Sequence, residues 1–155
     1  MTAIAIRSAT ETDANSLHRI HTAAVREVCA GSYAELQVEA WLQKRSPGGY
    51  QPAIEAEQMF VAELGKEVIG FGHSVPGEVL AIFVEPTHHR RGVGALLLSE
   101  ALERSGSPAE LEATLNAVPF YERHGFVAQG QLVVQRNGVD ILVERMRLES
   151  PSHQQ

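Results

Sequence analysis

One segment of the chain combines the residue types that bind a pyrophosphate group. Residues 84–95 read VEPTHHRRGVGA, and a predicted strand enters the segment while Gly92 and Gly94 open a predicted helix. The first turn of a helix presents unpaired N–H groups and the positive end of the helix dipole. Glycine lets the backbone approach an anion closely, and Arg90 and Arg91 add positive charge. The segment therefore predicts an anion cradle.

The spacing within this segment argues against two common nucleotide-binding loops. A phosphate-binding P-loop needs Gly-Lys-Ser/Thr, and neither Gly92 nor Gly94 is followed by that pattern. A dinucleotide-binding loop needs a third glycine three positions after the second, where this chain has Leu97, and it follows a first strand, whereas here the strand is about the fourth. ATP, GTP and NAD are therefore poor fits. A glycine-tolerant turn with two solvated arginines is the non-binding alternative.

Two motifs resemble those of the GCN5-related N-acetyltransferase (GNAT) superfamily. Residues 89–94 are similar to its coenzyme A loop, Gln/Arg-x-x-Gly-x-Gly/Ala, with His89 in place of the usual Gln or Arg. Residues 115–126, LNAVPFYERHGF, are similar to a later motif, an Asn followed by an FYxxxGF helix. The resemblance extends from about Ile4 to Leu148. It implies acetyl-CoA as co-substrate and direct transfer of the acetyl group to a primary amine, without a covalent enzyme intermediate.

The resemblance also assigns roles to particular residues. Tyr121 occupies the general-acid position near the coenzyme A sulfur, and Asn116 is expected to hydrogen-bond the pantetheine arm. Without a cofactor, Tyr121 would be a half-buried helix residue and Asn116 a cap at a strand end. The residues expected to bind the cofactor are Ile82, Phe83, Val84, His89, Arg90, Arg91, Gly92, Val93, Gly94, Ala95, Asn116 and Tyr121.

Two residues are candidates for the general base. Glu78 begins the predicted strand before the loop, where some relatives place a catalytic glutamate, and an ordinary turn residue is its alternative. His73 lies on the neighbouring strand, where its alternation with apolar residues favours a half-buried sheet histidine. A water chain without a dedicated base is a third possibility. The acceptor pocket is expected around His21, Val25, Tyr33, Trp41 and the strand at 131–136.

These residues must be positioned by a sheet with helices packed on it. Strands are predicted at 3–9, 59–64, 68–75, 79–84, 111–115, 126–135 and 139–148, and the nearly continuous apolar run at 79–84 predicts burial on both faces. Helices are predicted at about 10–30, from 32 onward, at 92–105 and before Gly125, with a loop at 46–49. Gly65-Lys66 and Asn137-Gly138 predict tight hairpins. The order is β-α-α-β-β-β-α-β-α-β-β, a mixed α/β fold. The resemblance implies a mostly antiparallel GNAT-like sheet of about seven strands with about four helices.

Composition sets the broad class. The 155 residues suit one domain, expected at 1–149 with a polar tail at 150–155. The net charge of −6 argues against nucleic acid as a partner, and no apolar run suggests a membrane span. The single cysteine, Cys29, predicts a small buried side chain, and a cytoplasmic location is the default. No set of the seven histidines predicts a metal site.

Three functional hypotheses follow. The first is an N-acetyltransferase acting on a small-molecule amine or a peptide, with a possible homodimer because relatives often dimerise. The second is a non-catalytic acyl-CoA-binding sensor or regulatory module of the same fold, which the unusual His89 and the uncertain base keep open. The third is a nucleotide-binding protein that uses the same glycine loop.

Overall fold

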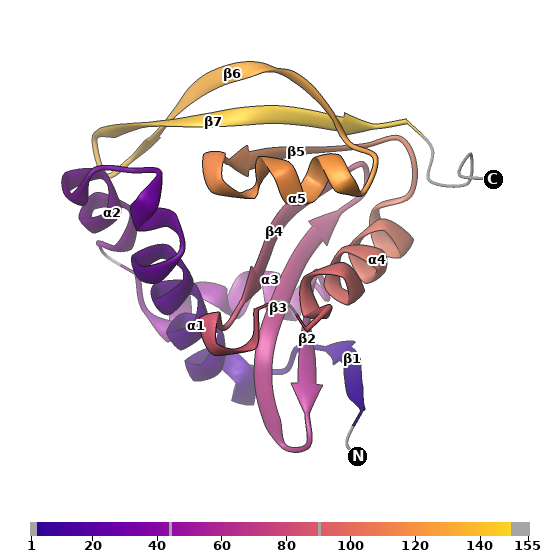
Figure 1. Cartoon of the computed structure of the whole chain (residues 1–155). Helices are drawn as coiled ribbons and strands as arrows, with labels where there is room; N and C mark the ends of the chain where they lie inside the picture. The colour runs from indigo at the N-terminus through magenta and orange to yellow at the C-terminus, as the bar shows by residue number, and fades with distance from the viewer. Residues whose placement is uncertain (1–2, 44, 90, 150–155) are drawn as a thin grey trace.

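A seven-stranded sheet forms the centre of the computed structural model, which describes residues 3–43, 45–89 and 91–149 (Figure 1). The strand order is β1-β2-β3-β4-β5-β7-β6, and every neighbouring pair except β4–β5 is antiparallel. The strands are β1 Ile4–Ser8, β2 Met59–Leu64, β3 Glu67–Val75, β4 Glu78–Val84, β5 Ala109–Thr114, β6 Val127–Arg136 and β7 Val139–Leu148. The predicted fold class is therefore confirmed. The predicted tail lies outside the described residues.

In the described part of the chain, five α-helices pack on this sheet, one more than predicted. They are α1 Ala14–Glu27, α2 Glu35–Leu42, α3 Gln51–Glu55, α4 Val93–Ser105 and α5 Val118–Arg123. The additional helix, α3, follows a 3-10 turn at Pro47–Tyr50, where the composition predicted only a loop. Pro52 is compatible with the first turn of α3, and Tyr50 and Ile54 are buried against Leu17 and Ile20 of α1. Tertiary packing therefore makes a helix from a segment with weak helical periodicity.

The two hairpins have the predicted turns. Leu64 pairs with Glu67 across Gly65-Lys66, and Gly65 has a φ of 65°. At the other hairpin, Asn137 and Gly138 both have positive φ, 52° and 82°, as a type I′ turn requires. The turn residues therefore set the register of β2–β3 and β6–β7.

The helices cover both faces of the sheet. Helix α4 packs on β2, β3 and β4 through Val93, Leu97, Leu98 and Ala101, which are buried in a cluster with Phe60. Helix α1 contacts β3 and β4, and its Leu17 and Ile20 share a second cluster with Met59, Val61 and Phe71. No helix of the described ranges combines the length and apolar character that crossing a membrane requires.

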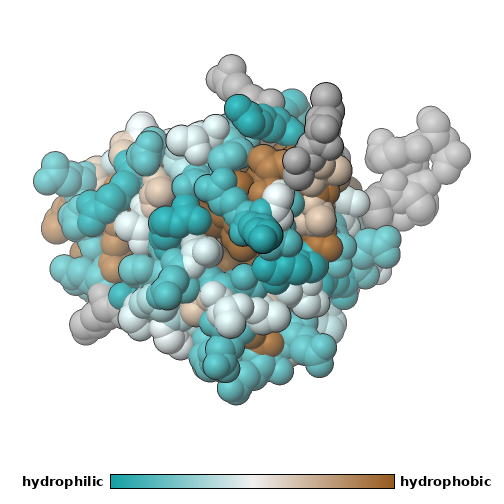
Figure 2. Space-filling model, turned by 90° about the horizontal axis from the view of Figure 1, so that it is seen from below, coloured by the Kyte–Doolittle hydropathy of each residue, from teal (hydrophilic) through white to brown (hydrophobic). Residues whose placement is uncertain are grey.

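Strands β4 and β5 diverge, and this divergence corrects one prediction. They are parallel and register only at Glu78 and Glu110, so the sheet opens into a V beyond that point (Figure 1). Strand β4 is consequently not buried on both faces: Ala81 to Val84 are half-buried and Leu80 is 45% exposed. The apolar run instead lines cavities in the opening. Figure 2, a view of the molecule from below, shows apolar surface recessed among polar residues.

Candidate active site

The glycine loop is built around the start of α4. Gly92 is the N-cap of α4 with a left-handed φ of 78°, a conformation that favours glycine. Gly94 lets the Phe120 ring pack closely against the backbone of α4, because a Cβ at this position would lie 3.3 Å from two atoms of that ring. The second glycine therefore lets α4 and α5 meet beside the loop, in addition to leaving the backbone amides of the first turn accessible.

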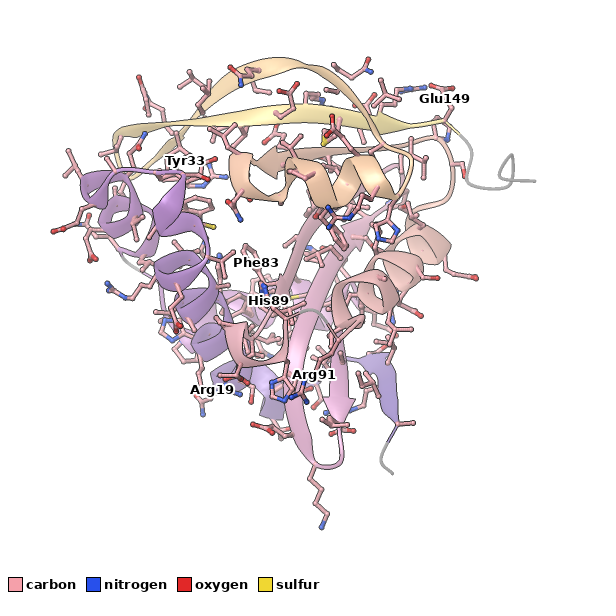
Figure 3. The ribbon with its side chains drawn as sticks, viewed as in Figure 1. Arg19, Tyr33, Phe83, His89, Arg91 and Glu149 are labelled. Atoms are coloured by element: carbon pink, nitrogen blue, oxygen red, sulfur yellow. The ribbon has the colours of Figure 1, made fainter. Side chains whose placement is uncertain are left out.

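His89 closes the other end of the loop. Its Nε2 lies 3.1 Å from the carbonyl oxygen of Val84, the last residue of β4, while the side chain remains exposed (Figure 3). In this contact the imidazole donates to the strand end. Arg91 is exposed, and Arg90 lies outside the described residues.

Glu85 anchors the loop to α1. Arg19 donates a hydrogen bond to Glu85 Oε1 at 2.5 Å, and the other carboxylate oxygen, Oε2, lies 3.8 Å from His88 Nδ1. The backbone N–H of Glu85 also donates to the carbonyl of Ile69 on β3 at 2.8 Å. These contacts hold the end of β4 in position before the chain turns into the loop.

A cavity of about 570 Å³ lies along the loop and the open side of β4. It is lined by Ala24, Val28, Cys29, Ile82, Phe83, Val84, His88, His89, Gly92, Val93, Gly94, Ala95, Thr114, Asn116, Ala117, Phe120, Tyr121, Arg123 and His124. Ten of the twelve residues predicted to bind the cofactor are in this set. Of the other two, Arg91 is not among the lining residues and Arg90 is not described. We call this space the loop cavity.

Asn116 brings an unsatisfied acceptor to the loop cavity. Its Oδ1 is buried and has no hydrogen-bond partner among the described residues. Cys29 lies beside it, with its thiol near the side chains of Thr114 and Asn116, and burial raises the pKa of that thiol to about 11. A buried oxygen without a donor is costly, so it fits a ligand with amide N–H groups such as a pantetheine arm.

Tyr121 stands where the loop cavity meets a second space. It is 7% exposed, and no hydrogen bond to its hydroxyl occurs within the described residues. Burial raises the pKa of the phenol above its ordinary value near 10. The hydroxyl therefore stays protonated at neutral pH and is available as a donor.

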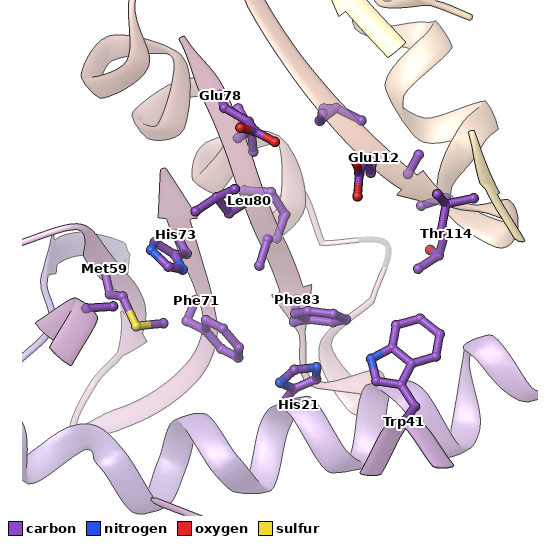
Figure 4. Close-up of a pocket in the computed structure, with 18 of the residues that line it drawn as sticks. His21, Trp41, Met59, Phe71, His73, Glu78, Leu80, Phe83, Glu112 and Thr114 are labelled. Atoms are coloured by element: carbon purple, nitrogen blue, oxygen red, sulfur yellow. The ribbon is translucent and has the colours of Figure 1, made fainter. Parts of the chain in front are cut away.

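The second space is a cavity of about 400 Å³, which we call the acceptor cavity (Figure 4). Both predicted base candidates line it: Glu78 at the start of β4, and His73 on β3. His73 Nε2 lies 2.9 Å from Gln58 Oε1, and burial lowers the pKa of the imidazole, which favours its neutral form. The residues shared by the two cavities are Ile82, Phe83, Thr114, Ala117 and Tyr121.

The predicted acceptor region is divided between the cavity and the core. His21, Trp41 and Arg136 line the acceptor cavity, whereas Val25 and Tyr33 are buried in a hydrophobic cluster. Tyr33 instead ties the fold together, because its hydroxyl donates to Leu142 O at 2.7 Å and accepts from the Leu115 N–H at 3.0 Å.

Several residues that line the cavities carry no signal in the sequence that marks them as site residues. Arg45, Tyr50 and Glu112 line the acceptor cavity, and Cys29 lines the loop cavity. Arg45 and Tyr50 flank the glycine-rich segment, in which no local pattern marks a site. Within residues 3–43, 45–89 and 91–149, no three His, Cys, Asp or Glu side chains are grouped as a metal site requires.

Comparisons with known proteins agree with this arrangement. Residues 29–149 match the family described as acetyltransferase (GNAT) domain. The chain is 30% identical over 138 residues to the uncharacterized N-acetyltransferase YafP of Escherichia coli strain K12, covering 89% of this chain and 91% of that protein.

Solved structures show the same fold. A GCN5-related N-acetyltransferase from Rhodopseudomonas palustris superposes with a TM-score of 0.83 at 24% identity, covering 96% of this chain and 97% of that one. The PaiA N-acetyltransferase of Thermoplasma acidophilum, in complex with coenzyme A, superposes with a TM-score of 0.76 at 21% identity, covering 95% and 99%. The chain belongs to the GNAT acetyltransferase family.

Proposed function

We propose that the protein is an acetyl-CoA-dependent N-acetyltransferase that acts on a primary amine by direct transfer. The observation that carries this proposal is the pair of cavities that share Tyr121 and the end of β4. The loop cavity contains the glycine loop. The acceptor cavity adjoins it, and five residues line both cavities. This arrangement suits two substrates that must meet at one point.

The loop cavity is the proposed cofactor site, and acetyl-CoA supplies the activated acetyl thioester there. The amides at the start of α4 would hold the pyrophosphate, and β4 would offer backbone groups from Ile82 to Val84 to the pantetheine arm. Asn116 Oδ1 would accept from an amide N–H of the same arm. The PaiA N-acetyltransferase of Thermoplasma acidophilum, which has the same fold and was solved in complex with coenzyme A, supports this assignment.

Tyr121 is the proposed general acid. Because burial raises the pKa of the phenol, it retains its proton until negative charge develops on the departing sulfur. Glu78 is the proposed general base, which would take the proton of the incoming ammonium directly or through water. Both groups line the acceptor cavity, Glu78 from the start of β4 and Tyr121 from α5.

A thiol-release assay with acetyl-CoA and a panel of amines, amino acids, polyamines and peptides tests the proposal. Release of coenzyme A is expected to depend on the amine. Tyr121→Phe is expected to lower kcat by about 10²–10⁴-fold, while the Kd for acetyl-CoA changes by less than about threefold. Tyr33→Phe is the matched control, since it removes a buried phenol hydroxyl that lines neither cavity.

Two outcomes contradict the proposal in different ways. Unchanged turnover in Tyr121→Phe rules out the acid role but leaves the enzyme activity standing. Tight acetyl-CoA binding with no turnover on any amine supports the binding module instead. Competition with ATP and NAD separates both from a nucleotide-binding protein.

A further inference from the structure

A buried histidine with one unused nitrogen lies at the wall of the acceptor cavity. His21, on α1, is 6% exposed and stacks on Phe83 with ring centroids 4.4 Å apart. Its Nδ1 lies 3.0 Å from the Tyr50 hydroxyl and 3.1 Å from Arg45 Nη1. Its Nε2 is buried and has no partner among the described residues.

The contact with Arg45 determines which nitrogen carries the proton. A guanidinium only donates hydrogen bonds, so Nδ1 must be the accepting, unprotonated nitrogen. Burial, and next the positive charge of Arg45, lower the pKa of His21 to about 3, so the ring is neutral. A neutral ring with a bare Nδ1 carries its hydrogen on Nε2. His21 therefore presents a fixed N–H donor that the protein leaves unpaired.

Two arginines lie near His21: Arg45 contacts its Nδ1, and Arg136 lines the same cavity. Arg45 and Arg136 both line the acceptor cavity with His21, and both add positive potential at the ring. No carboxylate of the described ranges lies within 4.0 Å of either guanidinium; Arg45 Nε donates to Trp41 O at 3.1 Å and Arg136 Nη1 to Gln135 O at 3.1 Å. Guanidinium groups that form no ion pair, close to a buried histidine with a free N–H, can bind an oxyanion.

The opposite end of the cavity has the opposite charge. Figure 4 shows Glu78 and Glu112 away from His21, with Phe83 between them and the imidazole. Glu112 is partly neutralised by Arg145 at 3.2 Å, whereas no ion pair is formed by Glu78 with another described residue. The cavity is therefore polarised, with a cationic wall near α1 and carboxylates toward the start of β4.

We propose that the acceptor carries an anionic group as well as its amine, and that His21 Nε2–H, Arg45 and Arg136 hold that group. The inference rests on the proposed acetyltransferase function and names its substrate class. A carboxylate on a small amine, as in a free amino acid or at the end of a very short peptide, has the required chemistry. A cavity of about 400 Å³ suits a small molecule of this kind.

Matched acceptors test the charge requirement directly. Amino acids, the same amino acids as their C-terminal amides, and the corresponding decarboxylated amines are assayed by thiol release, with dipeptides as a further arm. At least a tenfold higher kcat/KM is expected for the acids than for the amides. Higher activity with dipeptides than with free amino acids would identify the acceptor as a very short peptide, with its C-terminal carboxylate in the anion site. Equal rates for acids and amides overturn the inference.

Variants identify the groups that hold the anion. Arg45→Gln and Arg136→Gln are each expected to raise KM for the acid about tenfold or more, with a smaller effect on the amide, because a charge-assisted hydrogen bond is lost. His21→Gln retains a side-chain N–H donor and is expected to lose less than His21→Leu. Arg26→Gln is the control, since Arg26 pairs with Glu39 on the surface and lines neither cavity.

A binding measurement separates this inference from the proposed function. N-acetylated amino acids and their amides are titrated into the protein by calorimetry, which requires no turnover. Tighter binding of the acids, reduced by Arg136→Gln, supports the anion site even if no amine is acetylated. Equal affinity for acids and amides contradicts the anion site even if other amines are acetylated.

Discussion

The proposed chemistry depends on two buried side chains. Tyr121 and His21 are buried, and burial moves their pKa values in opposite directions, upward for the phenol and downward for the imidazole. In both cases the neutral form is favoured, because a low-dielectric site disfavours charge. Each group therefore keeps a hydrogen available at neutral pH, which is what a donor to a developing thiolate or to a bound anion requires.

The two base candidates can be separated by substitution. Glu78→Gln is expected to lower kcat by about 10²-fold or more if the carboxylate removes the ammonium proton. His73→Gln is expected to change kcat by less than about threefold, since His73 Nε2 already contacts Gln58. The kcat of each variant is measured with a saturating amine across pH 6–9. A larger loss in His73→Gln than in Glu78→Gln would reverse the assignment.

Asn116 is expected to act in binding rather than in turnover. Asn116→Ala removes the unpartnered Oδ1 and is expected to weaken acetyl-CoA binding by about 5–30-fold, the equivalent of one buried hydrogen bond. The Kd is measured by calorimetry, with the kcat at saturating acetyl-CoA changing much less. Because Asn116 lies next to Cys29, Cys29→Ala serves as a control for general disturbance of this wall. Unchanged affinity would contradict a hydrogen bond from the cofactor to this oxygen.

The strands carry the site on a scaffold that tolerates little change in volume. Gly72 on β3 pairs with Ile82 on β4, and a Cβ at Gly72 would lie 2.3 Å from Phe60 Cε2. The Phe60 ring is fully buried, and the Arg104 guanidinium lies over it at 4.7 Å. The ring has little room to move, and the absence of a side chain at Gly72 is a packing requirement.

Gly72→Ala is expected to lower the free energy of unfolding by about 1–3 kcal/mol, because the ring or the strand must move to admit a methyl group. Gly31→Ala is the matched control: a Cβ there meets no atom within 4 Å, and its φ is not in the left-handed region. Urea denaturation of the three proteins measures the difference. Equal stability of the two variants would show that β3 shifts without cost.

The molecule as a whole is organised around the break in its sheet. Segments distant in sequence meet there: α1 with His21, the end of β4 with Phe83, and α5 with Tyr121. Figure 1 shows α1 and α4 on either side of the opening, with α5 near its upper edge. Homodimerisation and a cytoplasmic location stay predictions from the sequence.

Acid is expected to destabilise the fold through the buried histidine. His21 has a pKa of about 3 in the folded chain and near 6.5 when exposed, so the unfolded chain binds more protons between these values. The contribution of neutral His21 to the free energy of unfolding is present above about pH 6.5 and is lost as the pH falls below that value. Between pH 7 and pH 5, His21 alone should account for about 2 kcal/mol of lost stability.

Urea denaturation at pH 7 and pH 5 measures this loss. In His21→Gln the difference between the two pH values is expected to shrink by that amount, while the depressed pKa of His73 contributes to both proteins. Asp13 does not interfere: burial raises its pKa, but hydrogen bonds from Arg7 and Thr10 outweigh that effect and lower it, so it titrates below this range. An undiminished difference in the variant would show that His21 is already charged in the folded protein.

Local chemistry made much of this protein predictable. Asn137-Gly138 and Gly65-Lys66 specify turns through their own dihedral preferences, and the strands beside them follow. Gly92, Gly94, Asn116 and Tyr121 stand at recognisable spacings within two short segments. The order of the strands along the chain and ten of the nineteen residues that line the loop cavity could therefore be predicted from short local segments, and the same two segments carry the resemblance to the family.

Non-local packing decided the rest. The apolar run at β4 predicts burial, but only the divergence of β5 shows that it lines cavities instead. His21 on α1 contacts Arg45 and Tyr50, which lie in the segment before α3. No sequence pattern in either segment predicts this contact. Side-chain periodicity reports which face of an element is apolar, whereas its partner across a long loop depends on how all the elements pack. For this protein, the sequence specified the turns, the loop and the motif helix, and the tertiary structure specified the acceptor cavity.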